Sequence, residues 1–538
     1  MRRSARLATV GWLALGVAES LSAISLGSDP RLNAADFSIT VFASGLSFPS
    51  SLAELPDGSI LVATAVPGGS FFASPGQLLR FVDADGNGIA DGPGSVQASG
   101  LPNALTSVRL AGDLVLVLGA GPGGRSISVL RRGAQASDAY TLEGTIALSF
   151  PANWSHTSYA LAVHELDAQT HHIYFNVGSF DNANATSASA SASGLVTGTL
   201  VGDSVYRFTL SDQGVGALQV SGLIRIAAGL RNAAGIARDE SSGDLWLSEN
   251  GIDSPQNLAE PFSADELNAV AASDLGGSAE DFGFPSGYVA YRTGTVVGGG
   301  IQPLIAFQPI PDPQSGAEAE GAVEIAFAPP LFPASLQGGV LVGFHGMFAQ
   351  AGAANEENAV AFVDRANGGY FHFLPPGQTG VGHPNGLLAT QDSLFIADFS
   401  SQGAISVAGS GSGVIHQLRA IGPDADTDGV LDVADNCPHA PNPTQADSGG
   451  IGATSGADGV GDACQCGDVT GDGRVSSSDA IVIARSLLVP PTAQQAMPQL
   501  CNVGGSASCS SADAVVVTRA LLVPPTASIA QSCAPALP

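Results

Sequence analysis

Lysine is absent from the chain of 538 residues, and all 19 basic residues are arginines. Any mechanism that needs a lysine is therefore excluded. The 48 acidic residues outweigh these arginines and give a formal net charge of −29. A field of this sign repels nucleic acid and anionic membranes, and it suits an extracellular protein that binds metal cations.

Cysteine is missing before Cys437, and all 6 cysteines lie from there onward. An even, clustered set in an exported chain predicts three disulfides confined to the tail. Zinc ligation is the alternative, although no CxxC pair is present. Sequence order and the internal repeat described below favour the pairs Cys437–Cys464, Cys466–Cys501 and Cys509–Cys533.

Long apolar runs are missing beyond the N-terminus, so the sequence predicts no membrane span. Arg2, Arg3 and Arg6 precede an apolar run over 7–18, and small residues follow it. This pattern predicts a signal peptide over 1–23. We therefore expect a secreted protein that is extracellular or attached to the cell surface.

Charged residues are scarce over 37–420, whereas glycine-containing turns are frequent. Short β-rich runs flank these turns, as in LAELPDGSILVAT (52–64) and IARDESSGDLWLSENG (236–251). Hairpins that recur at intervals of roughly fifty to seventy residues are typical of propeller blades. The sequence predicts a mainly β protein with a six-bladed β-propeller; one or two β-sandwiches are the alternative. The Ser/Ala-rich stretch 183–193 is expected to be a flexible loop.

The composition changes after Arg419, where acidic residues, small residues and cysteines replace the strand pattern. We place a domain boundary near 421–423. The tail then divides into a calcium-binding segment over 421–465 and a short α-helical module over 466–538.

The stretch AAGLRNAAGIARDESSGDLWLSENGID (227–253) resembles the central motif of the glucose/sorbosone dehydrogenases. Weaker similarities keep the same order along the chain, for example WSHTSYALAV (154–163) and GHPNGLLATQDSLFIADF (382–399). Those proteins are soluble quinoprotein propellers that use pyrroloquinoline quinone (PQQ) and calcium. The resemblance covers almost the whole predicted propeller and implies a sugar or aldose dehydrogenase.

The resemblance also implies roles for individual residues. His156 would be the base that takes the substrate proton, while Arg231 and Asn232 would contact the quinone. Glu249 and Asp265 would help to hold calcium near the same loop. An imidazole suits the base because its pKa lies near neutrality, and a guanidinium suits an anionic quinone.

The chain departs from the family pattern at several cationic positions. The cofactor-contacting lysine cannot exist, and His383 stands where an arginine is usual. AEGAVEIAFAPP (319–330) lacks the usual histidine. Arg231 can instead be a structural arginine, and His156 a loop histidine. A non-catalytic propeller that binds carbohydrate or protein is therefore the rival hypothesis, and too few arginines at the central opening would favour it.

One acidic loop lies inside the predicted propeller. DADGNGIADG (83–92) places four oxygen-bearing side chains at positions one, three, five and nine of an EF-hand-like loop: Asp83, Asp85, Asn87 and Asp91. It has no carboxylate at position twelve. A structural calcium loop and a plain acidic hairpin turn both remain possible.

The segment DADTDGVLDVADNCPHAPNP (424–443) resembles a thrombospondin type 3 repeat. Its carboxylates fill positions one, three, five, nine and twelve of a calcium loop: Asp424, Asp426, Asp428, Asp432 and Asp435. Gly429 at position six allows the sharp bend. The spacing predicts calcium binding, and a disordered acidic linker is the alternative.

An internal repeat follows, since 479–493 and 513–527 are nearly identical and both end in Pro-Pro-Thr-Ala. Each is expected to be an amphipathic helix ended by its prolines. A loop before the first helix has calcium-type ligands at positions one, three, five and twelve: Asp468, Thr470, Asp472 and Asp479. The two units resemble a dockerin, which implies a cohesin partner or, alternatively, a surface-retention module.

Overall fold

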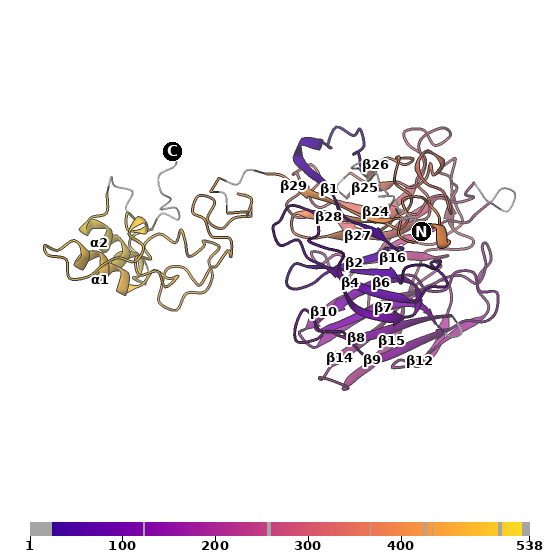
Figure 1. The fold of residues 1–538 in the computed structure, drawn as a ribbon, viewed down its shortest axis with the longest axis horizontal. Helices are drawn as coiled ribbons and strands as arrows, with labels where there is room; N and C mark the ends of the chain where they lie inside the picture. The colour runs from indigo at the N-terminus through magenta and orange to yellow at the C-terminus, as the bar shows by residue number, and fades with distance from the viewer. Residues whose placement is uncertain are drawn as a thin grey trace, which may run out of the picture. The chain divides into compact units, whose positions relative to one another are not determined.

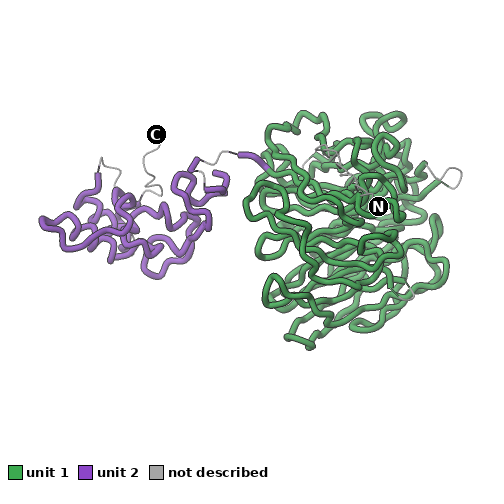
Figure 2. The backbone as a smooth tube through the Cα atoms, in the orientation of Figure 1, with its two compact units in different colours: residues 1–419 green, residues 420–538 purple. Residues whose placement is uncertain are grey.

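The computed structural model describes residues 24–529, except for 122–123, 255–259, 366, 423–424, 427, 433, 504–507 and 524. The predicted signal peptide therefore lies outside the described residues. The chain divides into two compact units, and the division falls between Arg419 and Ala420 (Figure 2).

Six antiparallel-based sheets of four or more strands follow one another along the described part of the first unit (Figure 1). Strands are given from the innermost outward. The first sheet consists of β2 (Ser51–Glu54), β3 (Ile60–Ala65), β4 (Gly76–Phe81) and β5 (Ser95–Leu101). The second consists of β6 (Asn103–Ala111), β7 (Leu114–Gly121), β8 (Gly124–Arg131), β9 (Thr141–Ser149), β12 (Ser189–Gly194) and β13 (Gly198–Val201), and the third of β10 (Leu161–Asp167), β11 (Thr170–Val177), β14 (Ser204–Asp212), β15 (Leu218–Ala228) and β19 (Glu280–Asp281).

The remaining three sheets have four strands each. They are β16 (Ala233–Arg238), β17 (Leu245–Glu249), β18 (Asp265–Val270), β22 (Ile305–Phe307); β23 (Ala322–Phe327), β24 (Val340–Phe344), β25 (Val360–Asp364), β26 (Gly369–Leu374); and β27 (Pro384–Ala389), β28 (Ser393–Asp398), β29 (Gly413–Ala420), β1 (Phe37–Leu46). A small hairpin and three 3₁₀ turns complete this unit: β20 (Tyr288–Val289), β21 (Val296–Val297), η1 (Ala34–Asp36), η2 (Gly352–Ala354) and η3 (Val407–Gly409).

The six innermost strands form a closed ring, because each contacts the innermost strand of the next sheet and β27 returns to β2. The early strand β1 is the outer strand of the last sheet and so joins the two ends of the ring. Backbones approach closely at the centre, where a Cβ on Gly235 would lie 1.8 Å from the carbonyl oxygen of Val323. The predicted six-bladed propeller is confirmed, and the sandwich alternative is wrong.

Apolar side chains fill the spaces between neighbouring blades. Leu116, Phe175 and Phe208, for example, belong to one fully buried cluster that is shared by the second and third blades. Burial of such side chains is the main term that holds blades together. The core therefore explains why the blade strands read as apolar runs rather than as strict alternations.

The expectation of a flexible loop over 183–193 is wrong for its second half. Residues from Ser189 onward form β12, which pairs with β9 on one side and β13 on the other. Ala190 and Ala192 alternate inward and are buried, while their serine neighbours are exposed. The strand extends the second blade from a segment that lies between strands of the third.

The second unit contains two helices, α1 (Ser477–Ser486) and α2 (Ser511–Ala520), and the turn η4 (Pro498–Leu500). Both helices begin at a reciprocal serine–aspartate capping box, formed by Ser476 with Asp479 and by Ser510 with Asp513. The predicted helices exist, but each ends before its Leu-Val-Pro-Pro sequence rather than at the prolines.

The disulfides of the second unit agree only in part with the predicted pairing. Cys437–Cys464 is confirmed. Cys501 pairs with Cys509 across a separation of 8 residues. The predicted Cys466–Cys501 and Cys509–Cys533 pairs are therefore wrong. The nearby pair is favoured because α2 packs on the segment before it, in the same apolar cluster as Val469 and Ile483.

Candidate functional site

The candidate site lies at the end of the ring where the innermost strands begin, which we call the upper mouth. Neighbouring strands are antiparallel, so the ends of second strands and the starts of third strands gather at this mouth. Arg231 and Asn232 directly precede β16, Glu249 ends β17 and Asp265 begins β18. The topology thus brings together most residues that the family resemblance singled out.

Ser179 joins His156 to Arg231, because it hydrogen-bonds to both residues. The Ser179 amide donates to the Arg231 carbonyl oxygen at 2.7 Å, and the His156 ring Nδ1 lies 2.8 Å from the Ser179 hydroxyl. That hydroxyl donates to the Asp181 carbonyl oxygen at 2.6 Å, so it accepts from the imidazole. Nδ1 therefore carries the proton of the neutral ring, and Nε2 has the lone pair.

Burial and the neighbouring Arg231 charge lower the pKa of His156 to about 3. The ring is therefore neutral near pH 7, as a general base must be. A base with so low a pKa nevertheless has little affinity for a substrate proton, because efficient general bases have a pKa near the working pH. The tautomer suits the predicted role of His156, whereas its basicity does not.

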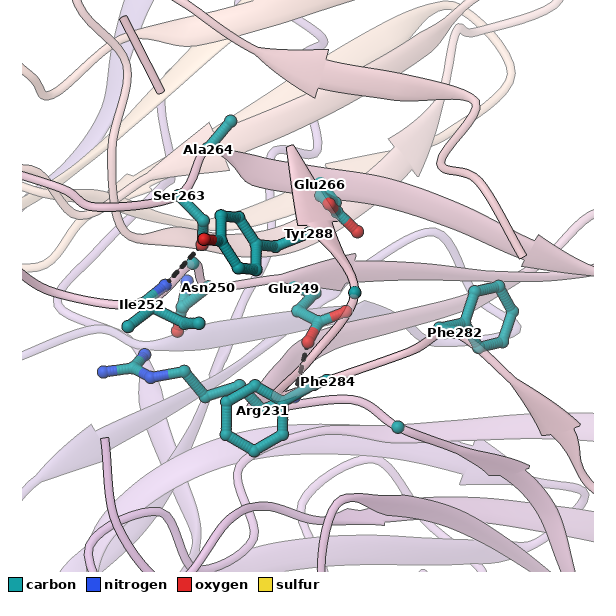
Figure 3. A pocket seen from close by; sticks show the side chains of 13 residues that line it. Arg231, Glu249, Asn250, Ile252, Ser263, Ala264, Glu266, Phe282, Phe284 and Tyr288 are labelled. Atoms are coloured by element: carbon teal, nitrogen blue, oxygen red, sulfur yellow. Dashed lines mark hydrogen bonds between the residues drawn. The ribbon is translucent and has the colours of Figure 1, made fainter. Parts of the chain in front are cut away.

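The Arg231 guanidinium is buried and already engaged. It donates from Nε to the Asn182 carbonyl oxygen at 3.0 Å, and from Nη2 to the Asp253 carboxylate at 2.6 Å. Figure 3 shows this guanidinium extending away from Glu249, whose carboxylate faces the Arg231 backbone amide. Arg231 thus pairs with a carboxylate. This is the structural role that the sequence left open for Arg231 beside quinone binding.

Asn232 belongs to a network of buried amides rather than to an open surface. Its side-chain NH₂ donates to Asn250 Oδ1 at 2.8 Å, and its Oδ1 accepts from Asn176 at 3.4 Å. Asn250 in turn donates to the Ala322 carbonyl oxygen at 2.7 Å. The network links three blades at the mouth and leaves the Asn232 amide committed to protein partners.

Glu249 and Asp265 are fully engaged by main-chain or amide donors. Asp265 accepts from the Gly251 amide and the Ala322 amide, both at 2.7 Å. Glu249 accepts from the Arg231 amide and from Asn268, which also donates to Glu266. Burial, followed by the charge of Glu266, raises the pKa of Glu249 well above its usual range. Through these contacts, Glu249 and Asp265 hold the backbone of neighbouring loops in place. Calcium ligation by these two carboxylates stays a prediction.

His383, which stands at the position of a usual arginine, is 0 % exposed. Its ring stacks on that of His345 with centroids 3.9 Å apart. Nδ1 lies 2.7 Å from the His345 carbonyl oxygen, and Nε2 lies 3.0 Å from the Gly403 carbonyl oxygen. Both ring nitrogens thus lie against protein groups, and the buried ring offers no group to a ligand.

A second guanidinium, Arg125, lies near the start of β8 at the same mouth. It is 6 % exposed, and burial lowers its pKa to about 10. It donates to Thr106 and to the Ala104 carbonyl oxygen, and it lies over the Tyr159 ring at 5.3 Å. Like Arg231, it is covered by protein rather than turned toward the opening.

An ion pair between opposite blades crosses the centre of the ring. Arg109 of β6 pairs through Nη2 with Glu324 of β23, and Ser51 of β2 lies 3.1 Å from the Arg109 Nη1 atom. The glutamate had a sequence signal, because it interrupts the apolar run AEGAVEIAF. Its partner had none, since the two residues are 215 positions apart.

Below this ion pair, the lower end of the ring contains a cavity of about 430 Å³. All six innermost strands contribute to its wall, which is mainly apolar and includes Glu54, Arg238 and Phe327. By contrast, the pocket beside Arg231 and Glu249 in Figure 3 has a volume of only about 10 Å³. That space holds about one water molecule.

These observations test whether the residues fit a quinone. An anionic quinone with its carboxylates needs accessible cations. In the described upper mouth, the guanidiniums of Arg231 and Arg125 are buried and bonded to protein groups, and that of Arg292 is paired with Glu260 and Glu318. The surrounding carboxylates repel an anionic quinone, and the pocket of about 10 Å³ has no room for one. The residues present therefore do not fit PQQ in this conformation.

The three acidic loops share one internal hydrogen-bond pattern. The amide at position seven donates to the side chain at position five in each: Ile89 to Asn87, Val430 to Asp428 and Arg474 to Asp472. The amide at position six donates to position one at 2.8 Å in two of them, from Gly88 to Asp83 and from Gly473 to Asp468. Such turns shape the backbone of calcium loops.

Within 424–435, the structure brings three of the predicted ligands together. Carboxylate oxygens of Asp426, Asp428 and Asp435 all lie within 4.8 Å of one another. Asp432 instead accepts from the Ala425 amide at 2.8 Å, as Asp91 does from Ala84 in the propeller loop. Asp424 lies outside the described residues.

In the loop before α1, Asp468 and Asp479 are fully buried and meet at Thr470. The Thr470 hydroxyl lies 3.2 Å from Asp468 and 2.9 Å from Asp479. Burial raises the pKa of Asp468, because the charged form loses its hydration. Calcium ligation by this set, together with Asp472, stays a prediction.

The sequence profile of the dockerin type I domain matches residues 466–522. No curated protein sequence matches the chain. Among solved structures, the PQQ-bound aldose sugar dehydrogenase from Streptomyces coelicolor is 18% identical, with 72% of this chain and 99% of that chain covered and a TM-score of 0.45. The PQQ domain of pyranose dehydrogenase from Coprinopsis cinerea is 14% identical, with 74% and 97% covered and a TM-score of 0.44. An α-L-arabinanase from Penicillium chrysogenum is 9% identical, with 71% and 98% covered and a TM-score of 0.42.

The dockerin match falls on the module that the internal repeat predicted. Among the described residues, no helix is both long and apolar enough to cross a membrane. The solved structures named above are at most 18% identical to this chain, so the chemistry of this propeller rests on its own residues.

Proposed function

We propose that the protein is an extracellular propeller that binds a carbohydrate or protein ligand and is attached to a cohesin-bearing partner by its dockerin module. The observation that carries the first part is the engagement of Arg231 by Asp253 and Asn182. With this guanidinium committed, and with Arg125 and Arg292 also bonded to protein groups, the described part of the upper mouth offers a quinone no unengaged guanidinium. The propeller then acts through binding.

The cavity at the lower end of the ring supports a small-ligand site. Its volume of about 430 Å³ lies within the range of small-molecule pockets. Apolar walls with a few polar groups, such as Glu54 and Arg238, are typical of such pockets. A glycan array probed with the full chain tests this proposal. Arg238→Ala should weaken the binding of any ligand that enters the cavity.

The dockerin match supports attachment through the tail. Ser477 and Ser478 begin α1. They are small hydroxyl residues, of the type that the resemblance to dockerins places at recognition positions. Calorimetry of the full chain with a purified cohesin should show binding in calcium and none in chelator. Binding that is equal in both conditions would contradict calcium-dependent docking.

A quinoprotein sugar dehydrogenase remains the second candidate, because His156 has the neutral tautomer that leaves Nε2 with its lone pair. Reconstitution with PQQ and calcium, followed by an aldose oxidation assay with a dye acceptor, separates the two candidates. We expect no dye reduction above that of a heat-denatured control. Turnover that disappears in His156→Ala would favour the dehydrogenase.

A further inference from the structure

Three glutamates converge at the upper mouth on the fifth blade. Glu318 and Glu320 lie in the segment that leads into β23, and Glu357 lies between β24 and β25. One carboxylate oxygen of each lies within 4.8 Å of the other two. Oxygens that are each about 2.4 Å from one calcium ion cannot be more than about 4.8 Å apart. The spacing thus permits a shared ion.

Glu357 provides an independent reason to expect a ligand. It is only 8 % exposed, yet no described residue donates a hydrogen bond to its carboxylate, which points into the cluster. Oε1 of Glu320 is fully buried and has no hydrogen-bond partner. A buried carboxylate oxygen without a partner is costly, and a bound cation would offset that cost.

The charge around the cluster is unbalanced. Among the described residues, Arg292 pairs with Glu318 at 2.5 Å and with Glu260 at 3.1 Å, and no arginine pairs with Glu320 or Glu357. Neighbouring carboxylates without a cation between them repel each other.

We propose that Glu318, Glu320 and Glu357 bind a calcium ion at the upper mouth of the propeller. Carboxylates are hard oxygen donors, which calcium prefers, and the Tyr291 hydroxyl holds the Glu318 carboxylate in place at 3.2 Å. The site is separate from the acidic loops at 83–91 and in the tail. It does not depend on the proposed binding function or on quinone chemistry.

Tyrosine makes the site distinguishable by spectroscopy. Residues 420–538 contain no tyrosine or tryptophan, whereas Tyr291 contacts the proposed ligands directly. Terbium substitutes for calcium and emits when a nearby tyrosine absorbs light. Titration of the chelator-treated full chain with terbium should therefore give saturable, tyrosine-sensitised emission from the propeller and not from the tail, and added calcium should quench this emission.

Two variants test the assignment, and two controls accompany them. Glu320→Gln and Glu357→Gln should each raise the terbium dissociation constant about tenfold or more, because each removes a charged ligand. Glu356→Gln changes the exposed neighbour of Glu357 and should leave the titration unchanged. Asp83→Ala should also leave it unchanged, since it alters only the other acidic loop of the propeller.

Thermal unfolding keeps the test decisive if a variant folds poorly. Glu357→Gln removes a repelling charge, so in chelator its melting temperature should equal or exceed that of the wild type, while the increase on adding calcium shrinks. The proposal is overturned if wild-type emission does not saturate. It is equally overturned if Glu357→Gln and Glu320→Gln retain wild-type terbium affinity and the full calcium-dependent gain in melting temperature.

Discussion

The ion pair across the central channel offers a quantitative test of how the ring is held together. Arg109 and Glu324 come from opposite blades, and the Glu324 side chain is 7% exposed. Arg109→Met would leave the carboxylate buried, with the Ser51 hydroxyl at 3.4 Å as its remaining hydrogen-bond donor among the described residues. Burial raises the pKa of Glu324, whereas the Arg109 charge acts to lower it.

Removal of one partner of a buried pair costs about 3–5 kcal/mol, because the other charge is left without compensation. A propeller of about 380 residues has an unfolding entropy of about 0.8 kcal/mol/K. Arg109→Met should therefore lower the melting temperature by about 4–6 °C. The double variant Arg109→Met with Glu324→Leu should recover most of this loss, since no charge stays buried.

Tryptophan fluorescence during heating reports on the propeller and not on the second unit. Trp154 and Trp246 are in the propeller, Trp12 lies in the predicted signal peptide, and residues 420–538 contain no tryptophan. Arg132→Met, which breaks a peripheral pair with the exposed Asp113, is a matched control for loss of an arginine. A shift in Arg109→Met of less than about 1 °C, or a double variant as unstable as the sum of the singles, would refute this reasoning.

Three further predictions concern stability. Propeller stability should fall as the pH drops from about 6.5 toward 4. Burial lowers the pKa of His372 to about 4, so in this pH range only the unfolded chain binds a proton at this histidine. His372→Phe should remove about 3 kcal/mol of the loss at pH 4, and a pH profile of urea midpoints that this variant leaves unchanged would contradict the prediction. Asp428→Ala and Asp472→Ala should each abolish a different calcium-binding step in calorimetry of the full chain, because their loops are separate; loss of the same step in both would show one shared site. A chain that ends at Arg419 should be soluble and unfold cooperatively in reductant, since its core contains no cysteine; aggregation of this chain alone would place the domain boundary elsewhere.

Local patterns were sufficient to predict the propeller. Hairpins such as 52–64 and 236–251 carry their own turn signals, and their recurrence indicates blades. The strand β12 was missed because a Ser/Ala-rich segment has low β-propensity and becomes a strand only by pairing with β9. Tertiary context, rather than local preference, decides such elements.

The disulfide errors have a similar cause. Cysteine spacing cannot show which sulfurs meet, and only the packing around α2 brings Cys501 next to Cys509. The Cys437–Cys464 pair was predictable because both residues flank one acidic segment. Sequence order succeeds where a bridge closes a single module and fails where two repeat units pack together.

The candidate site shows what motif matching can and cannot predict. The motif placed His156, Arg231 and Asn232 near one another, as the start of β16 and the segment before β10 require. It could not show that Asp253 engages the Arg231 guanidinium, because a side chain's partner depends on folded geometry. The cluster of Glu318, Glu320 and Glu357 had no motif at all, since its members come from two distant segments.

The central claim is that the propeller acts by binding and not as a quinoprotein. Its most direct test is a titration of the full chain with PQQ in the presence of calcium, monitored through the absorbance of the quinone. Burial and engagement of Arg231 and Arg125 predict no saturable binding at micromolar quinone. Saturable binding at that concentration, weakened in Arg231→Ala and unchanged in Arg132→Ala, would contradict the claim and make the propeller a quinoprotein.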